Sequence, residues 1–164
     1  MVVYKIEMII KMTTIVFRDG LIWRFTIYNE LGHVDNITVT MVGDLKYGRT
    51  VHSLSYLLGF YNVKLNYVAP DSLQMPQHFI DDLTARGVKQ EKSDCLTDEI
   101  LAETDILYVT RIQQERFASQ EEYLKYKGVF VIDKNTVLKG KPTMVREKEW
   151  FGIITSVWCT LYPV

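Results

Sequence analysis

Strand-like and helix-like hydrophobic patterns alternate along the middle of the chain, and this alternation limits the possible folds most strongly. Residues Ile37–Val42 alternate in the manner of a strand, and the apolar positions of residues 51–61 then recur at helical spacing. Residues 63–67 and 76–87 repeat the pair, with a proline at the start of the second helix and a glycine after its end. The pattern predicts repeated strand–helix units.

The later residues continue this pattern. A third helix is expected to begin at Thr97, and it leads into residues 105–110, a nearly continuous apolar run typical of a strand buried in a parallel sheet. Ser119 and Glu122 have capping-box spacing, which predicts a further helix, and residues 129–132 supply another strand. Such units predict an α/β protein with a three-layer, Rossmann-like architecture, an open parallel sheet with helices on both faces.

This architecture predicts the location of a ligand site. In open parallel sheets, ligands bind beyond the carboxyl ends of the strands. The loops that start at Gly43, Ala69 and Arg111 are therefore expected to share one edge of the molecule.

The composition of the chain limits the classes of function that it can have. The chain has 164 residues, a length typical of one compact domain. It carries 19 basic against 20 acidic side chains, and this near-neutral charge argues against a surface that binds nucleic acid. Two cysteines, Cys95 and Cys159, lack the spacing of metal ligands and are too few for a disulfide scaffold, which favours a cytoplasmic location. A small-ligand binder or an enzyme remains.

The two ends differ from the middle. Residues 1–24 mix charged and apolar side chains, so no signal peptide is expected. Residues 150–164 carry no charge, but a bilayer-spanning helix needs roughly 20 apolar residues. We expect this segment to be a strand or a buried tail, not a membrane contact.

Basic and amide side chains gather in the predicted strand-end loops. Lys46 and Arg49 follow the first strand, and Arg111, Gln113 and Arg116 follow the run of residues 105–110. Guanidinium groups bind carboxylates through paired hydrogen bonds, so two arginines on separate loops could hold a small dicarboxylic acid. The alternative is that these arginines pair with loop carboxylates, namely Asp44, Glu115 and Glu122.

Other chemistries fit less well. Gly43 and Gly48 match neither a dinucleotide fingerprint nor a phosphate-binding loop. His52 has no second metal ligand at a suitable spacing, so it is expected to be a packed or hydrogen-bonded histidine, and His33 and His78 are expected in loops or at the surface. Ser53 and Ser55 have no convincing base and acid partners, so a hydrolase triad is not expected.

Three segments carry a family resemblance: TMVGDLKYGRTVHSL at residues 40–54, YVAPDSLQMPQ at 67–77 and DILYVTRIQQERF at 105–117. Together they resemble the aspartate-binding domain of aspartate carbamoyltransferase, over about residues 25–145. The resemblance implies carbamoyl transfer from carbamoyl phosphate to the amine of L-aspartate, in pyrimidine synthesis, with no metal or organic cofactor. Ornithine-using relatives carry a different motif in place of TRIQQER.

The resemblance also implies roles for individual residues. Arg49 and Arg111 would bind the carboxylates of aspartate, and Gln113 would help to shape the pocket. Supporting loop positions would be Lys46, Tyr47, Thr50, Arg116 and Glu122.

The resemblance divides the chain into three parts: an unmatched lead (1–24), the aspartate-binding domain (25–145) and a divergent apolar tail (146–164). The carbamoyl-phosphate domain of the family has no counterpart in this sequence, so the chain alone is expected to be inactive unless a complementary domain is supplied. The family forms catalytic trimers. Two alternatives remain: a non-catalytic interaction or regulatory module, and, with less support, a generic nucleotide-binding domain.

Overall fold

A computed structural model describes residues 25–110, 132, 136 and 138–148. Residues 25–31 are helical. The elements that follow are β1 (Ile37–Val42), α2 (Arg49–Leu58), β2 (Val63–Val68), the 3-10 turn η1 (Asp71–Leu73), α3 (Gln77–Ala85), β3 (Lys89–Ser93), α4 (Asp98–Glu103), β4 (Ile106–Val109) and β5 (Val145–Lys148).

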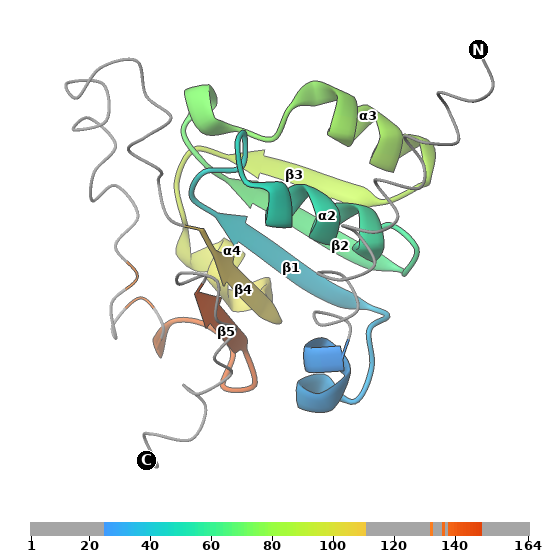
Figure 1. Cartoon of the computed structure of the whole chain (residues 1–164). Coiled ribbons are helices and arrows are strands. Elements are labelled where there is room, and N and C mark those ends of the chain that lie inside the picture. Colours follow the sequence, from blue (N-terminus) through green and yellow to red (C-terminus); the bar gives the residue numbers. More distant parts are fainter. Residues whose placement is uncertain (1–24, 111–131, 133–135, 137, 149–164) are drawn as a thin grey trace.

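The strands form one parallel sheet of five strands in the order β3-β2-β1-β4-β5. Helices α2 and α3 lie on one face of this sheet and α4 lies on the other (Figure 1). The predicted α/β class, with an open parallel sheet between two helical layers, is confirmed. The strand order was not predicted, and it decides where the loops meet.

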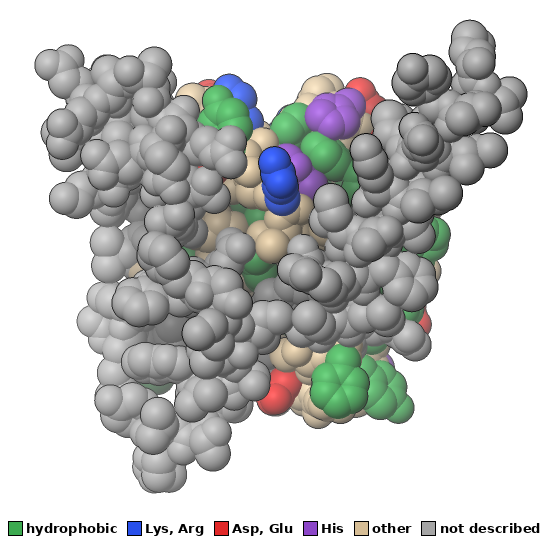
Figure 2. All heavy atoms as spheres, in the orientation of Figure 1, with side chains coloured by type: hydrophobic (Ala, Val, Ile, Leu, Met, Phe, Trp, Pro, Cys, Tyr) green, Lys and Arg blue, Asp and Glu red, His purple; other side chains and the backbone are tan. Residues whose placement is uncertain are grey.

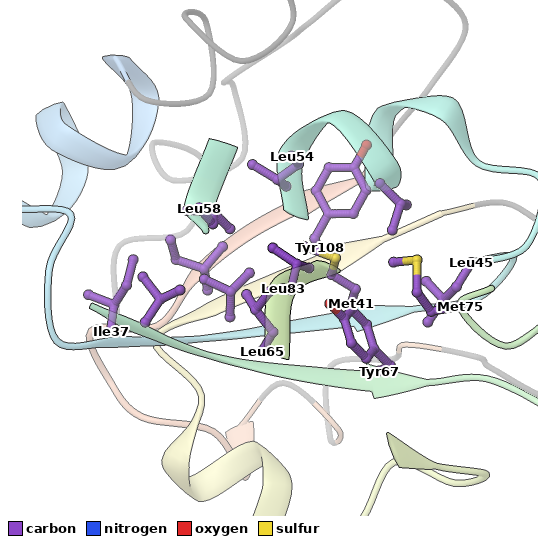
Figure 3. Packing of buried hydrophobic residues seen from close by; sticks show 14 of the residues in the cluster. Ile37, Met41, Leu45, Leu54, Leu58, Leu65, Tyr67, Met75, Leu83 and Tyr108 are labelled. Carbon is purple, nitrogen blue, oxygen red and sulfur yellow. The ribbon is translucent and has the colours of Figure 1, made fainter. Parts of the chain in front are cut away.

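The larger hydrophobic core lies between the sheet and the two helices α2 and α3. Met41 of β1 and Tyr67 of β2 are fully buried on this side. Leu54 and Leu58 of α2 and Leu83 of α3 belong to the same cluster (Figure 3). Because successive side chains of a strand point to opposite faces, the alternation in the sequence corresponds to this two-sided burial.

The face under α4 combines a small apolar cluster with a polar network. Asn66 of β2 donates its amide to Thr40 Oγ1 (3.3 Å) and to Glu103 Oε1 (3.0 Å). Lys64 donates to both oxygens of the same glutamate at 2.9 Å, and this hydrogen bond lowers the pKa of the Glu103 carboxyl. The apolar cluster consists of the buried residues Val42, Val68, Leu101, Leu107 and Met144.

The predicted helix start at Thr97 is confirmed. The Thr97 side chain accepts a hydrogen bond from the Ile100 amide (3.3 Å), and α4 follows directly. This is the arrangement of an N-cap residue, which satisfies an amide that has no partner within the helix.

Strand β3 was not predicted. Its sequence, KQEKS, has no apolar alternation, and its side chains are exposed or half-buried. The strand forms because its backbone pairs in parallel with β2, with Lys64 beside Lys89 and Val68 beside Ser93. Charged side chains are common on edge strands, where they discourage pairing with other molecules.

The second edge strand, β5, runs across the domain boundary that we expected after residue 145. The helix predicted after Ser119 lies outside the described residues, as does the strand predicted at 129–132 apart from Ile132. Within the described part of the chain, no helix has the length and apolar content that a bilayer crossing requires.

Candidate functional site

The strand order creates a switch point at the carboxyl ends of β1 and β4. From β1 the chain first proceeds outward to β2 and β3, and then returns to β4 on the other side of β1. Strands β2 and β4 therefore lie on opposite sides of β1, and such switch points are where open α/β sheets bind ligands. The structure thus directs attention to the loop after Val42 and to the residues after Val109.

Gly43 and Thr110 join these two loops. Gly43 adopts a φ of +116°, and a β-carbon added to it would overlap the Thr110 carbonyl oxygen and lie 2.7 Å from Thr110 Oγ1. The Thr110 amide donates to the Val42 carbonyl (2.8 Å), and its hydroxyl donates to the carbonyls of Val42 (3.3 Å) and Asp44 (3.4 Å). Because Thr110 immediately precedes Arg111, the segment carrying that arginine starts beside the first loop.

The first loop is held in a compact turn. The buried Asp44 accepts a hydrogen bond from the Tyr47 amide through Oδ1 (3.0 Å), which closes the turn on itself. The Leu45 amide donates to the Leu73 carbonyl (3.0 Å), so the turn is also attached to the loop that follows β2. The loops that start at Gly43 and Ala69 share one edge, as predicted.

Gln74 fastens the second loop. Its Nε2 group donates to the carbonyls of Ala69 and Ser93, both at 2.9 Å, and to that of Tyr67 at 3.3 Å. One side chain therefore ties the carboxyl ends of β2 and β3 together. No pattern in the sequence marked Gln74 for this role, because its three acceptors lie on backbone groups that only the folded sheet brings together.

Arg49 is the first residue of α2 and lies directly after the turn. Gly48 precedes it as N-cap without a side-chain cap, and the first turn of α2 contains no acidic residue. The Arg49 side chain is exposed, and its guanidinium group has no hydrogen-bond or ion-pair partner among the described residues. It is therefore available to an anionic ligand, and the backbone N–H groups of the helix start add positive potential.

The other predicted residues in the described region are close to Arg49 in the sequence. Lys46 and Tyr47 are exposed, and the Lys46 ammonium lies 5.1 Å from the centroid of the Tyr47 ring. Thr50 is half-buried in the first turn of α2. The remaining predicted site residues lie outside the described residues: Arg111, Gln113, Arg116 and Glu122.

The histidines occupy structural positions. His52 stacks on the Phe79 ring, with a centroid separation of 4.2 Å, and hydrogen-bonds to the Leu45 carbonyl (2.8 Å). Burial lowers the pKa of His52. The prediction of a packed, hydrogen-bonded histidine is confirmed, and His33 and His78 are exposed as expected. On the face of the molecule drawn in Figure 2, histidine side chains lie beside basic and hydrophobic ones.

Comparison with known proteins identifies relatives of this arrangement. Residues 35–145 match the family described as aspartate/ornithine carbamoyltransferase, Asp/Orn binding domain. Over 121 residues the chain is 56% identical to the multifunctional protein CAD of Squalus acanthias, which covers 74% of this chain and 5% of that protein. It is 49% identical over 122 residues to the aspartate carbamoyltransferase catalytic subunit of Methanobrevibacter smithii, covering 74% of this chain and 38% of that subunit.

Solved structures agree in fold. An aspartate transcarbamoylase from Trypanosoma cruzi, in complex with N-(phosphonacetyl)-L-aspartic acid, superposes with a TM-score of 0.71 at 39% identity. The match covers 79% of this chain and 43% of that one. The ligand-free form of the Trypanosoma cruzi enzyme gives a TM-score of 0.70 at 38% identity. The chain therefore spans less than half the length of the structures that it resembles.

Proposed function

The chain belongs to the aspartate/ornithine carbamoyltransferase family, whose Asp/Orn binding domain it matches, and from this premise we propose that it binds L-aspartate. In this proposal it supplies the aspartate-binding part of an aspartate carbamoyltransferase. The partner substrate, carbamoyl phosphate, is bound by a second domain of such an enzyme.

The contact between Gly43 and Thr110 carries this proposal. It joins the turn that leads to Arg49 with the residue that immediately precedes Arg111, at the switch point of the sheet. The exposed guanidinium group at the start of α2 supports a role in ligand binding, because no described side chain neutralises it. Aspartate is favoured over ornithine because relatives at 46% to 50% identity are named aspartate carbamoyltransferase catalytic subunits or multifunctional proteins.

The chemistry follows from two cationic groups around one diacid. Each charge-assisted hydrogen bond contributes roughly 1.5–3 kcal/mol, so two guanidinium contacts are sufficient for binding near the millimolar level, about 4 kcal/mol. With both carboxylates held, the neutral amine of aspartate faces the carbonyl carbon of carbamoyl phosphate. The nitrogen–carbon bond forms, the carbon–oxygen bond to phosphate breaks and inorganic phosphate leaves, and the proton lost by the amine passes to the phosphate or to solvent.

Rate enhancement in this reaction depends on holding both substrates together. Well-oriented partners reach effective molarities of about 10⁵–10⁸ M, and an enzyme gains this advantage only when both substrates are bound. We therefore expect no measurable turnover from the 164-residue chain alone. We expect turnover when the chain is mixed with a separately produced carbamoyl-phosphate domain of a relative, and turnover by the isolated chain would contradict this assignment.

The direct test of aspartate binding is a titration of the isotope-labelled chain with L-aspartate, followed by amide NMR shifts. Shifts are expected around residues 44–50 and at Thr110, with succinate giving similar shifts and L-ornithine giving none. Arg49→Ala and Arg111→Ala are each expected to weaken binding at least about tenfold, the effect of losing one charged contact. Arg86→Ala is the matched control. Arg86 is also exposed, but its guanidinium carbon lies 5.0 Å from the centroid of the Phe60 ring, outside the proposed site.

Two results would overturn the proposal. A chain that is folded but gives no shifts with aspartate does not bind it in this site. Equal weakening by Arg49→Ala and Arg86→Ala would mean that the effect is general and that Arg49 does not contact the ligand.

A further inference from the structure

His52 is attached to the turn before α2 at two points. Its backbone amide donates to the Gly48 carbonyl (3.2 Å), as expected of the first helical turn. Its side chain reaches back to the Leu45 carbonyl at 2.8 Å. The backbone and the ring of one residue therefore hold both ends of the segment 45–48, from which α2 and Arg49 start.

The hydrogen bond defines the state of the ring. A carbonyl oxygen only accepts, so Nε2 carries the proton that is donated to Leu45. Burial lowers the pKa of the His52 imidazole, more strongly than the hydrogen bond to Leu45 raises it, and the neutral ring is thus favoured. The neutral ring has a single N–H group, and this group donates its hydrogen bond to the Leu45 carbonyl.

The ring has a defined orientation. It stacks against Phe79 of α3 with a centroid distance of 4.2 Å and an interplanar angle of 26°. Tyr56 meets the same Phe79 ring edge-on at 5.1 Å, and His78 meets it at 4.2 Å. Because Tyr56 also packs against Phe79, the N–H group of His52 points at a fixed place in the turn.

Leu45 is consequently held through both of its backbone polar groups. Its amide is bound by the Leu73 carbonyl and its carbonyl by the His52 ring, while the preceding residue, Asp44, accepts from the amide of Tyr47. Without the ring N–H group, the Leu45 carbonyl would lose its side-chain donor, and the peptide group between Leu45 and Lys46 could rotate. The position of the helix start, and with it the Arg49 side chain, would then be less well defined.

We propose that His52 is a positioning residue: its Nε2–H group holds the Leu45 carbonyl and thereby sets the turn from which Arg49 reaches the aspartate. This inference rests on the proposed function for its ligand, but the effect on the turn does not. His52 itself touches no substrate in this proposal and takes no part in proton transfer. Binding energy of an arginine depends on its being pre-positioned, because ordering a loose turn costs affinity.

Two substitutions separate the hydrogen bond from the volume of the ring. His52→Gln retains an N–H donor at nearly the position of Nε2, whereas His52→Leu retains bulk and removes the donor. His78→Leu is the matched control. It removes another ring that contacts Phe79, and the His78 ring forms no hydrogen bond with the described residues.

The first measurement is amide hydrogen exchange in the full chain, without ligand. The Leu45 and Tyr47 amides are expected to exchange about five- to tenfold faster in His52→Leu, and to stay within about twofold of the original chain in His52→Gln and His78→Leu. The second measurement is aspartate affinity by NMR titration. His52→Leu is expected to bind aspartate about five- to tenfold more weakly than the original chain, and His52→Gln and His78→Leu are expected to stay within about twofold of it.

The outcomes are distinguishable from those of the proposed function. Unchanged exchange in His52→Leu, or equal acceleration in His52→Leu and His52→Gln, would overturn the positioning role. If the exchange pattern is as expected but aspartate affinity is the same in all variants, the turn is set by His52 but does not position Arg49, and the inference fails. If the original chain binds no aspartate at all, the proposed function fails, and with it the part of this inference that concerns the ligand.

Discussion

The α-carbon of Gly43 lies so close to Thr110 that a side chain at this glycine has no space. Its φ of +116° and the 2.7 Å separation between an added β-carbon and Thr110 Oγ1 exclude other residues on two independent grounds. Together with the hydrogen bonds from Thr110 to Val42 and Asp44, this contact joins two residues that are 67 positions apart in the sequence.

Replacing this glycine is expected to damage both stability and the site. We predict that Gly43→Ala lowers the free energy of unfolding by about 2–4 kcal/mol, because strain at positive φ is added to displacement of the Thr110 peptide. Gly87→Ala is the matched control: Gly87 has a φ of +81° but open space around it, and the expected loss is about 1 kcal/mol. Urea unfolding measures both values, and equal losses would contradict the contact.

Acid is expected to weaken the packing of His52. Because burial lowers the pKa of His52 below its ordinary 6.5, the folded state favours the neutral ring. The stability that this ring contributes is complete above pH 6.5 and is lost as the pH falls from 6.5 through the lowered pKa. The nearby charges of Asp44 and His78 act on the ring in opposite directions, and Asp44 favours protonation.

The comparison is between the original chain and His52→Gln, whose amide does not titrate. The free energy of unfolding is expected to fall more steeply between pH 7.5 and 5.5 in the original chain than in the variant. Parallel pH profiles for the two proteins would show that His52 is not responsible.

The buried side-chain amide of Asn66, on the α4 face of the sheet, is expected to tolerate replacement by a carboxylate poorly. Thr104 donates to the Ile100 carbonyl (2.5 Å), so Thr40 donates to Thr104, and the Asn66 amide donates in turn to Thr40 and to Glu103. A carboxylate in place of this amide would face acceptors and the negative charge of Glu103.

We therefore predict that Asn66→Asp lowers the free energy of unfolding by about 3 kcal/mol at pH 7, and by less at pH 5, where the new carboxyl is partly protonated. Asn62→Asp is the control, since Asn62 is an exposed amide. Urea unfolding at the two pH values tests the prediction, and a loss for Asn66→Asp no greater than that for Asn62→Asp would contradict it.

The N-cap of α4 offers a smaller, independent prediction. Thr97→Ala is expected to cost about 1 kcal/mol, because the Ile100 amide loses its acceptor, whereas Thr97→Asp retains an acceptor and is expected to cost less than half of that. Thermal or urea unfolding of the two variants gives the difference. The same loss in both would indicate that the threonine acts through packing and not as a cap.

Much of the fold was predictable because the relevant signals are local. The strands Ile37–Val42 and Val63–Val68 have the alternation that two-sided burial requires, and Thr97 has the side chain that a helix start requires. Strand β3 was missed because an edge strand needs no apolar side chains: its backbone hydrogen bonds to β2 suffice. No local signal in Lys89–Ser93 distinguishes it from a polar loop.

The site divides in the same way. The predicted loops after Gly43 and Ala69 lie on one edge as expected, and His52 is packed and hydrogen-bonded as expected. The roles of Arg49, Arg111 and Gln113 in binding aspartate remain predictions. Thr110 and Gln74 were not identified, because their partners are backbone carbonyls far away in sequence.

The amino-acid order alone thus specified the strands β1, β2 and β4, the helices α2, α3 and α4, and which residues are chemically suited to hold a dicarboxylate, since periodicity and side-chain chemistry are properties of neighbouring residues. The order of the strands, the pairing of β4 beside β1 and the contact of Gly43 with Thr110 arose only on folding. These features depend on hydrogen bonds and close packing between distant backbone groups, and every residue except proline offers the same backbone donor and acceptor.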